Sequence, residues 1–316
     1  MSGIPGTILC GDIGGTNARL ALMRDGVMGD VANLAVADHP DLIAAIRAFL
    51  GDGPNLDGAL LAVAGPVTEG RCVLTNSGWV VDAAELQRAL PAKWVSVVND
   101  FETQAWALPI LGTHDLEPLG GGPTRPELPM AMIGPGTGLG MACLMPNGTV
   151  VVSEGGHATL AAGDDREAAA LIWLRGKFGH VSAERILSGD GMENLHAALA
   201  AIDGIEHVHL ESPAITAAAL DGSCARCVET VDRFCAILGS LSGDLALLFG
   251  ARGGVFITGG IPPKILPLLR RSPFRARFEH KGRFHDWLSP IATSVITRPN
   301  AAFAGIAARL AAGRRD

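Results

Sequence analysis

Apolar runs typical of buried strands alternate with segments of helical periodicity in the first third of the chain. Residues 8–22 contain two apolar runs separated by glycines and polar residues. Residues 41–50 place apolar side chains at helical spacing, and residues 58–65 form an apolar run that ends at a Gly-Pro pair. These patterns predict a strand, a helix and a second strand in succession.

The same alternation continues to residue 100. Residues 82–90 begin as a helix would, because Asp82 can cap the helix and Glu85 follows three residues later, as in a capping box. Residues 94–100 form a largely apolar strand that ends on two polar residues. Alternating strands and helices predict an α/β fold.

Residues 112–129 interrupt this pattern, because they are rich in glycine and proline and look too irregular for a helix or a strand. We place a domain boundary near residue 110, where this segment begins. Residues 130–153 then predict three strands joined by a glycine loop and by an Asn-Gly turn, which is a strong hairpin signal. Residues 164–250 are mostly helical in pattern.

Two glycine-rich hairpins occupy equivalent places in the two halves of the chain. Gly15-Thr16 in the first hairpin aligns with Gly136-Thr137 in the second, and strand, hairpin, strand and turn follow in the same order. This similarity predicts an internal duplication at the level of the fold. Asp12 has Ile133 as its counterpart, so only the first hairpin carries an acid at this place.

Composition narrows the classes of function. The chain has 316 residues, of which 48% are hydrophobic, and its formal net charge is −7. The acidic balance argues against nucleic-acid binding, and no apolar stretch approaches the roughly 20 residues that span a bilayer. Six cysteines are too sparse for a secreted disulfide framework, and the first residues lack the pattern of a signal peptide. We expect a cytoplasmic protein that acts on small molecules, with no nucleic-acid or membrane partner.

Clustered glycines suit a loop in which a phosphate approaches the backbone closely. Successive amides in a tight turn form a nest for anions, and the hydroxyls of Thr16 and Thr137 add donors. Neither hairpin is a Walker A loop or a Gly-x-Gly-x-x-Gly turn that opens a helix. Asp12 can orient Mg²⁺ or its waters against nucleotide phosphates. The alternative is two ordinary hairpins in which glycine serves only the turn.

Six motifs in order along the chain carry a resemblance to a known family. They are Asp12-Ile13-Gly14-Gly15-Thr16-Asn17, Asn99-Asp100, Gly134-Pro135-Gly136-Thr137-Gly138, Glu154-Gly155-Gly156-His157, Glu184-Arg185 and Gly259-Gly260-Ile261. With these motifs the chain resembles the bacterial glucokinase family, within the hexokinase and actin superfamily, over nearly its whole length. The resemblance implies ATP-dependent phosphorylation of glucose at its 6-hydroxyl.

The resemblance also implies two actin-like, ribonuclease-H-like α/β domains with an active-site cleft between them. The small domain covers residues 1–110 and is completed by a C-terminal helix over residues 301–316. The large domain covers residues 111–300. A homodimer is a further expectation from the family.

The resemblance assigns roles to individual residues. Asp100 is the general base, because phosphoryl transfer to a hydroxyl requires a group that accepts the proton. The sugar hydroxyls are bound by Asn99, Asp100, Glu154, His157 and Glu184. The implied cofactors are ATP and Mg²⁺, and Asp12 holds the metal through water. The residues implied to bind the nucleotide are Asp12, Gly14, Gly15, Thr16, Asn17, Gly136, Thr137, Gly138, Gly259 and Gly260.

The residues by themselves leave other interpretations open. Asn99 and Asp100 are also common at turns and helix caps, His157 can be a structural histidine, and Glu184 can be an exposed helix residue. Gly259-Gly260 also fits an ordinary turn after a strand. The alternative functions are a kinase of another hexose, such as fructose or mannose, and a sugar sensor without catalysis. A sensor needs neither Asp100 nor the Asp12 hairpin, and this chain has both acids.

Zinc is a separate question. His207-x-His209 and Cys224-x2-Cys227 offer four potential ligands, but the link between the pairs has no recognised zinc-site spacing. Related kinases and repressors that bind zinc carry Cys-x-Cys-Gly after the Gly-Gly-His motif, where this chain has Ala158-Thr159-Leu160. The chain therefore resembles the zinc-free branch of the family.

Overall fold

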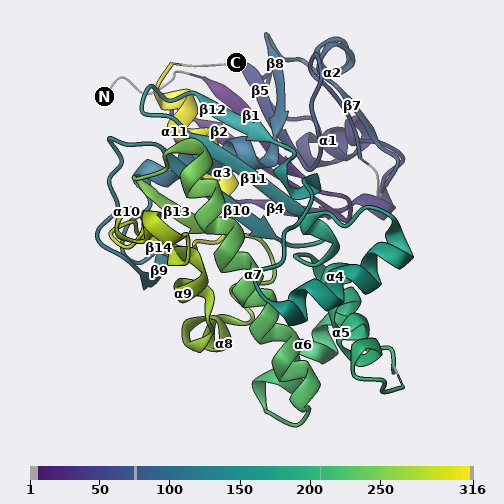
Figure 1. Cartoon of the computed structure of the whole chain (residues 1–316). Helices are drawn as coiled ribbons and strands as arrows, with labels where there is room; N and C mark the ends of the chain where they lie inside the picture. Colours follow the sequence, from purple (N-terminus) through teal and green to yellow (C-terminus); the bar gives the residue numbers. More distant parts are fainter. Residues whose placement is uncertain (1–5, 75–76, 207, 314–316) are drawn as a thin grey trace. The chain divides into compact units, whose positions relative to one another are not determined.

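The computed structural model describes residues 6–74, 77–206 and 208–313 (Figure 1). The chain divides into two compact units. Unit 1 contains residues up to Leu111 together with those from Pro299 onward, and unit 2 contains Gly112–Arg298.

Unit 1 is built on a mixed sheet in the order β3-β2-β1-β5-β8, with β4 paired to β2. The antiparallel pair β1 and β2 forms the first glycine hairpin, and β1, β5 and β8 run parallel. Every residue of β5 is buried, as the apolar run predicted. The strands are β1 (Thr7–Ile13), β2 (Asn17–Arg24), β3 (Val27–Met28), β4 (Ala32–Ala35), β5 (Gly58–Val63) and β8 (Val95–Asn99), and a separate pair is β6 (Arg71–Val73) and β7 (Val80–Asp82).

Two helices of unit 1 begin at aspartate caps, of which the sequence predicted the one at Asp82. The Asp41 carboxylate accepts the Ala44 amide at 2.7 Å, and the Asp82 carboxylate accepts the Glu85 amide at 3.0 Å. The helices are α1 (Leu42–Leu50), α2 (Ala83–Ala89), α3 (Asp100–Ala107) and α11 (Ala301–Ala311), with short 3₁₀ turns η1 (Val36–Asp38) and η2 (Leu108–Ile110). Helix α11 lies against α3, and a Cβ on Gly305 would stand only 1.7 Å from the Thr103 carbonyl oxygen. Glycine is therefore needed for this close contact.

Unit 2 contains a mixed sheet in the order β12-β11-β10-β13-β14-β9. The strands are β9 (Leu116–Gly120), β10 (Met130–Pro135), β11 (Leu139–Leu144), β12 (Val150–Ser153), β13 (Gly254–Ile257) and β14 (Thr293–Ile296). The prediction that residues 112–129 contain no strand was wrong, because β9 pairs with β14. Pro118 is tolerated there because β9 lies at the edge of the sheet, where a missing amide breaks no interior ladder.

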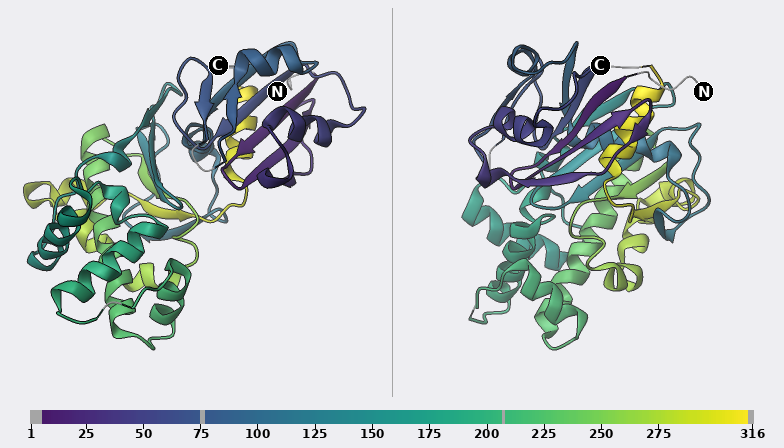
Figure 2. Two further views of the ribbon diagram at one scale, coloured as in Figure 1. Left: turned by 90° about the vertical axis from the view of Figure 1, so that its right-hand side faces the viewer. Right: turned by 180° about the vertical axis from the view of Figure 1, so that it is seen from behind.

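Helices cover the sheet of unit 2 and carry most of its core (Figures 1 and 2). They are α4 (Asp165–Phe178), α5 (Gly189–Ile202), α6 (Ser212–Leu220), α7 (Ala225–Phe249), α8 (Leu266–Arg271), α9 (Phe274–Glu279) and α10 (His285–Leu288), with turns η3 (Gly155–His157), η4 (Ala183–Arg185) and η5 (Gly282–Phe284). Helix α7 is the longest element, and Gly239 and Gly243 let α9 pack on its backbone. Cβ atoms there would lie 2.1 Å and 2.4 Å from carbonyl oxygens of Phe274 and Phe278.

The two sheets share a topology that agrees with an internal duplication. In unit 1 the hairpin β1–β2 is extended by the parallel strands β5 and β8. In unit 2 the hairpin β10–β11 is extended by the parallel strands β13 and β14. The carboxyl ends of parallel strands meet at one edge of a sheet, so each hairpin turn lies at the edge where α/β proteins gather functional groups.

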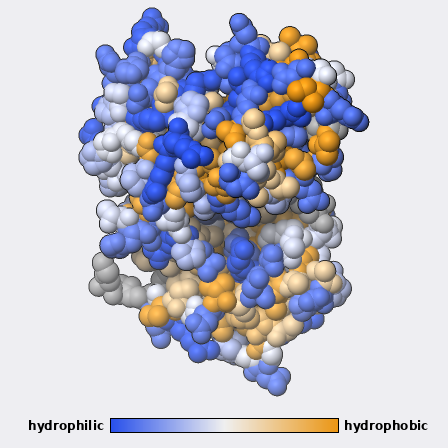
Figure 3. Space-filling view, turned by 90° about the horizontal axis from the view of Figure 1, so that it is seen from below, coloured by the Kyte–Doolittle hydropathy of each residue, from blue (hydrophilic) through white to orange (hydrophobic). Residues whose placement is uncertain are grey.

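Among the residues that the structure describes, no helix is both long and apolar enough to cross a membrane. On the face drawn in Figure 3, hydrophobic residues are interspersed with hydrophilic ones. Single exposed apolar side chains such as Leu248 and Val208 are ordinary for a protein surface.

Candidate active site

Asp12 lies near the end of β1 and faces Arg19 across the first hairpin. The register pairs these two residues directly, and the Arg19 guanidinium donates to the Asp12 carboxylate at 3.0 Å. The Asp12 side chain is 20% exposed. Burial raises the pKa of this carboxyl, and the charge of Arg19 opposes the shift. A carboxylate held in this way is a suitable partner for a cation that brings its own waters.

The turn of the first hairpin uses some of the groups that the sequence assigned to phosphate. The Gly14 amide donates to the Asn17 carbonyl at 2.9 Å, and the Thr16 carbonyl accepts the Val36 amide at 2.9 Å. These two bonds fix the shape of the loop. Gly14 thus has a structural role in the turn, while its role toward a nucleotide stays a prediction.

Asn99 and Asp100 lie where β8 ends and α3 begins. The Asn99 side chain caps the helix by accepting the Phe101 amide at 2.9 Å, and it donates to the Gly65 carbonyl at 3.0 Å. The Asp100 carboxylate also accepts the Phe101 amide, at 3.0 Å. The capping interpretation of Asn99 is therefore correct, and it leaves Asp100 half-buried in the first turn of α3.

The sheet of unit 1 brings these two groups of residues to one edge. Ile13 pairs with Val63, and Val63 pairs with Asn99, so the first hairpin and the end of β8 follow the same row. The Cys72 thiol is close enough to Asp100 to respond to its charge, because burial and then that charge raise the pKa of Cys72. Asp12 and Asp100, the two carboxylates that the sequence assigned to the reaction, thus belong to the same edge of unit 1.

The second hairpin and the loop after β13 meet in unit 2. Gly259 has a φ of +90°, and a Cβ on it would lie 2.3 Å from the Pro135 carbonyl oxygen. The Gly136 amide donates to the Gly138 carbonyl at 2.8 Å, and the Gly136 carbonyl accepts the Gly189 amide at 2.9 Å. Gly259 therefore lies beside the hairpin that carries Gly136 and Gly138, although it is far from them in sequence.

The three predicted sugar ligands of unit 2 also lie together. The His157 ring stands between Glu154 and Glu184, with a nitrogen 3.9 Å from a carboxylate oxygen of each. The Glu184 carboxylate accepts the Leu139 amide at 2.8 Å, and a Cβ on Gly138 would lie 2.6 Å from it. Glu184 is thus fixed against the second hairpin. Two carboxylates and an imidazole offer the mixed donors and acceptors that a polyol requires.

Three contributors to this arrangement were not identified from the sequence. Arg19 balances Asp12, the Gly65 carbonyl orients Asn99, and the start of α5 at Gly189 braces the second hairpin. Hairpin register could have indicated Arg19, because it lies opposite Asp12. The contacts of Gly65 and Gly189 join distant segments and have no local signal.

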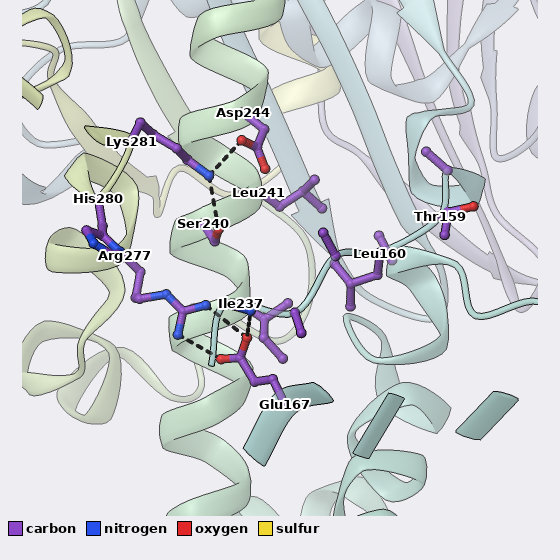
Figure 4. Close-up of a pocket in the computed structure, with 15 residues that line it drawn as sticks. Thr159, Leu160, Glu167, Ile237, Ser240, Leu241, Asp244, Arg277, His280 and Lys281 are labelled. Atoms are coloured by element: carbon purple, nitrogen blue, oxygen red, sulfur yellow. Dashed lines mark hydrogen bonds and ion pairs between the residues drawn. The ribbon is translucent and has the colours of Figure 1, made fainter. Parts of the chain in front are cut away.

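A cavity of about 310 Å³ in unit 2 contains none of the predicted site residues (Figure 4). Its charged lining groups are already paired. Arg277 donates to both oxygens of Glu167 at 2.8 and 2.9 Å, and Lys281 contacts Asp244 at 2.6 Å. The charges of this cavity are therefore engaged in holding α4, α7 and α9 together, and its lining residues Ala158 and Ala183 adjoin His157 and Glu184 in the chain.

Comparison with known proteins shows that this fold is that of a sugar kinase of the actin-like ATPase class and identifies the family. A family model described as Glucokinase matches residues 9–313. The glucokinase of Paramagnetospirillum magneticum is 44% identical over 308 residues, covering 95% of this chain and 96% of that protein. The glucokinase of Chromobacterium violaceum is 42% identical over 309 residues, covering 96% and 89%. The chain belongs to the glucokinase family.

Solved structures agree with this assignment. The glucokinase from an Antarctic psychrotroph has a TM-score of 0.87 and 39% identity, covering 96% of this chain and 98% of that chain. A ROK family glucokinase from Streptomyces griseus, solved with glucose and AMPPNP, has a TM-score of 0.64 at 21% identity, covering 98% of this chain and 100% of that chain. The second similarity shows that the fold is shared.

Proposed function

We propose that this member of the glucokinase family transfers the γ-phosphoryl group of ATP to the 6-hydroxyl of glucose, with Asp100 as the general base. A sugar hydroxyl is a weak nucleophile at neutral pH, so a positioned carboxylate must take its proton as the phosphoryl group arrives. The observation that carries this proposal is the placement of Asp100, half-buried after β8 at the sheet edge that also presents the Asp12 hairpin.

Asn99 and the unit 2 cluster serve sugar recognition in this proposal. The Gly65 carbonyl and the Phe101 amide hold both ends of the Asn99 amide group, so its orientation toward a hydroxyl is set in advance. Glu154, His157 and Glu184 accept and donate hydrogen bonds to further hydroxyls. A site of this kind rejects sugars that leave one of its polar groups unpaired.

The nucleotide and its metal are assigned to the glycine hairpins. Asp12 fits a water-mediated Mg²⁺ ligand, because it is a mostly buried carboxylate that is held in place by the guanidinium of Arg19. Thr16, Asn17 and the neighbouring glycines are assigned to the phosphates, together with Thr137 of the second hairpin. Gly259 and Gly260 are assigned to the adenosine. When bound, Mg²⁺ would neutralise charge on the phosphoryl oxygens.

Two further expectations are part of the proposal. The resemblance to the family supports a homodimer, and light scattering coupled to size-exclusion chromatography would measure the mass of the assembly directly. The composition supports a cytoplasmic location, which cell fractionation would test.

A panel of acceptors and donors tests the proposed function. The assay measures ADP release with ATP and glucose, fructose or mannose, and then sugar phosphate formation with ATP, ADP or polyphosphate and glucose. The proposal expects the highest kcat/KM for glucose with ATP. A higher kcat/KM for another hexose would make that hexose the assigned substrate. Glucose binding without any turnover would indicate that the protein is a sugar sensor.

A further inference from the structure

Three potential metal ligands meet in unit 2, and none of them is a residue assigned to the reaction. They are the imidazole of His196 on α5, the thiol of Cys224 just before α7 and the thiol of Cys227 in its first turn. One ligand atom from each residue lies within 4.8 Å of the other two, and Cys227 Sγ is 3.9 Å from His196 Nε2. Helices α5, α6 and α7, which frame this cluster, pack against one another (Figure 1).

The separations are close to those of a bound zinc ion. With Zn–S near 2.3 Å and Zn–N near 2.0–2.1 Å, tetrahedral geometry puts two sulfurs about 3.8 Å apart and a sulfur and a nitrogen about 3.6 Å apart. The observed spacing therefore needs shifts of about 1 Å or less in the side chains. Thiolate and imidazole ligands favour zinc over the harder cations Mg²⁺ and Ca²⁺.

The backbone around the cluster is arranged for a Cys-x2-Cys site. Cys224 is the N-cap of α7, and its sulfur accepts the Cys227 amide at 3.3 Å. A helix N-terminus favours a thiolate, which is the form that binds metal.

Burial differs among the three potential ligands. His196 and Cys227 are 2% and 0% exposed, whereas Cys224 is partly exposed. The ring and one sulfur thus lie in the packed interior of unit 2, and the Cys224 sulfur belongs to the residue that solvent reaches. The fourth position of a tetrahedral ion would be left to water.

We propose that His196, Cys224 and Cys227 form a structural binding site for a zinc ion that fastens α5 to the start of α7. The sequence offered the two cysteines with His207 and His209 as partners. His207 lies outside the described residues. The ligand cluster found among the described residues contains His196 instead of His207 or His209. This site differs from the cysteine cluster after the Gly-Gly-His motif that the zinc-binding relatives carry, and it does not depend on the assigned kinase activity.

Zinc affinity of the tag-free full chain tests the proposal. Metal-depleted, reduced protein is titrated with Zn²⁺ against a chromophoric chelator, and Co²⁺ is substituted to detect thiolate-to-metal charge-transfer absorption. The proposal expects one equivalent of Zn²⁺ with a Kd below about 1 μM, in the range of structural zinc sites weakened by the loss of one protein ligand. Bound Zn²⁺ should also raise the melting temperature.

Two variants separate the site from incidental binding. Cys224→Ser keeps an N-cap oxygen for the Cys227 amide but removes the thiolate, so this variant should fold. Its zinc affinity should fall by at least about 100-fold, because mutating groups that only support metal ligands already costs 10–100-fold in affinity. Cys235→Ala removes one thiol from the same helix outside the cluster and should bind like wild type. Equal affinity of the two variants would overturn the proposal.

Alkylation of the wild-type protein gives a second reading that needs no substitution. Cys224 is partly exposed, so zinc should slow its reaction with iodoacetamide, as read by peptide mass spectrometry. Unchanged alkylation at saturating Zn²⁺ would contradict the site. So would a purified chain that binds no zinc after reduction, or one that holds Cys224 and Cys227 only as a disulfide and gains no metal when reduced.

Discussion

At the scale of single residues, Asp12 and Asp100 lie on one sheet edge in different surroundings, which fits the different roles that we propose for them. Asp12 is mostly buried and paired with a guanidinium, whereas Asp100 is half-buried in the first turn of a helix. The first arrangement suits a fixed negative charge beside a cation. The second places a carboxylate at the end of β8, where we propose that it accepts the substrate proton.

Removing the charge of Asp12 should not destabilise the metal-free protein at neutral pH. The raised pKa means that the folded state disfavours the ionised carboxyl relative to the unfolded chain, so ionised Asp12 costs stability above its folded pKa. Below the unfolded pKa of about 3.9 this cost is absent. Asp12→Asn should therefore melt at or above the wild-type temperature at pH 7, and the gain should shrink as pH falls toward about 4. A lower melting temperature at pH 7 would mean that the ion pair with Arg19 outweighs burial.

The same substitution should impair catalysis. Because Asp12 is the proposed Mg²⁺ partner, Asp12→Asn should lower kcat/KM for Mg²⁺-ATP by at least about tenfold, the effect of losing about 1.4 kcal/mol, while glucose affinity stays close to wild type. Steady-state kinetics over a range of Mg²⁺ concentrations and calorimetry with glucose measure the two effects. Wild-type Mg²⁺ dependence in the variant would remove Asp12 from the metal site.

At the scale of elements, glycines decide how closely loops and strands meet. Gly259 and Gly260 are adjacent, yet only Gly259 has a positive φ and would place a Cβ within 2.3 Å of a backbone oxygen, whereas a Cβ on Gly260 would meet nothing within 4 Å. The loop after β13 therefore depends on Gly259 for its shape. Gly260 has room for a side chain.

This difference gives a matched pair of substitutions. Gly259→Ala should destabilise unit 2 by about 1–3 kcal/mol, because it adds backbone strain and a clash with Pro135, and should raise the KM for ATP by displacing the second hairpin. Gly260→Ala should change stability by less than about 0.5 kcal/mol. Urea denaturation of both variants provides the measurement. Equal losses of stability would show that the contact with Pro135 does not constrain the loop.

Periodicity and caps were sufficient to predict several elements from the sequence. The Asp82 cap and the buried strand β5 are confirmed, because both depend on neighbours within a few residues. Strand β9 was missed because its proline and glycine are typical of a loop, and its partner β14 lies far along the chain. Local pattern says little about an edge strand whose hydrogen bonds depend on a distant partner.

The candidate site shows the same division between local and distant information. The motifs identified which residues carry chemistry, but nothing local indicates that Leu139 donates to Glu184 or that Gly189 braces Gly136. The cysteine pair is visible in the sequence, whereas its histidine partner on α5 is not. Tertiary packing, which periodicity does not encode, brings such residues together.

At the scale of the whole molecule, the family assignment and the residue roles rest on different observations. Membership of the glucokinase family follows from identities of 42% and 44% over nearly the full length of the chain. The roles proposed for Asp100 and for the cluster of Glu154, His157 and Glu184 rest on the family motifs and on the chemistry of these side chains. A glucokinase without a proton acceptor at Asp100 would keep the fold and lose the mechanism.

The kcat of Asp100→Asn, measured with glucose and ATP, tests the central claim most directly. The amide keeps the shape of the side chain and cannot accept the proton, so kcat should fall by about 10² to 10⁴, the usual contribution of positioned proton transfer. Calorimetry should still detect glucose binding, and thermal melting should show a folded protein. A kcat within about threefold of wild type in the folded variant would contradict the assignment of Asp100 as the general base.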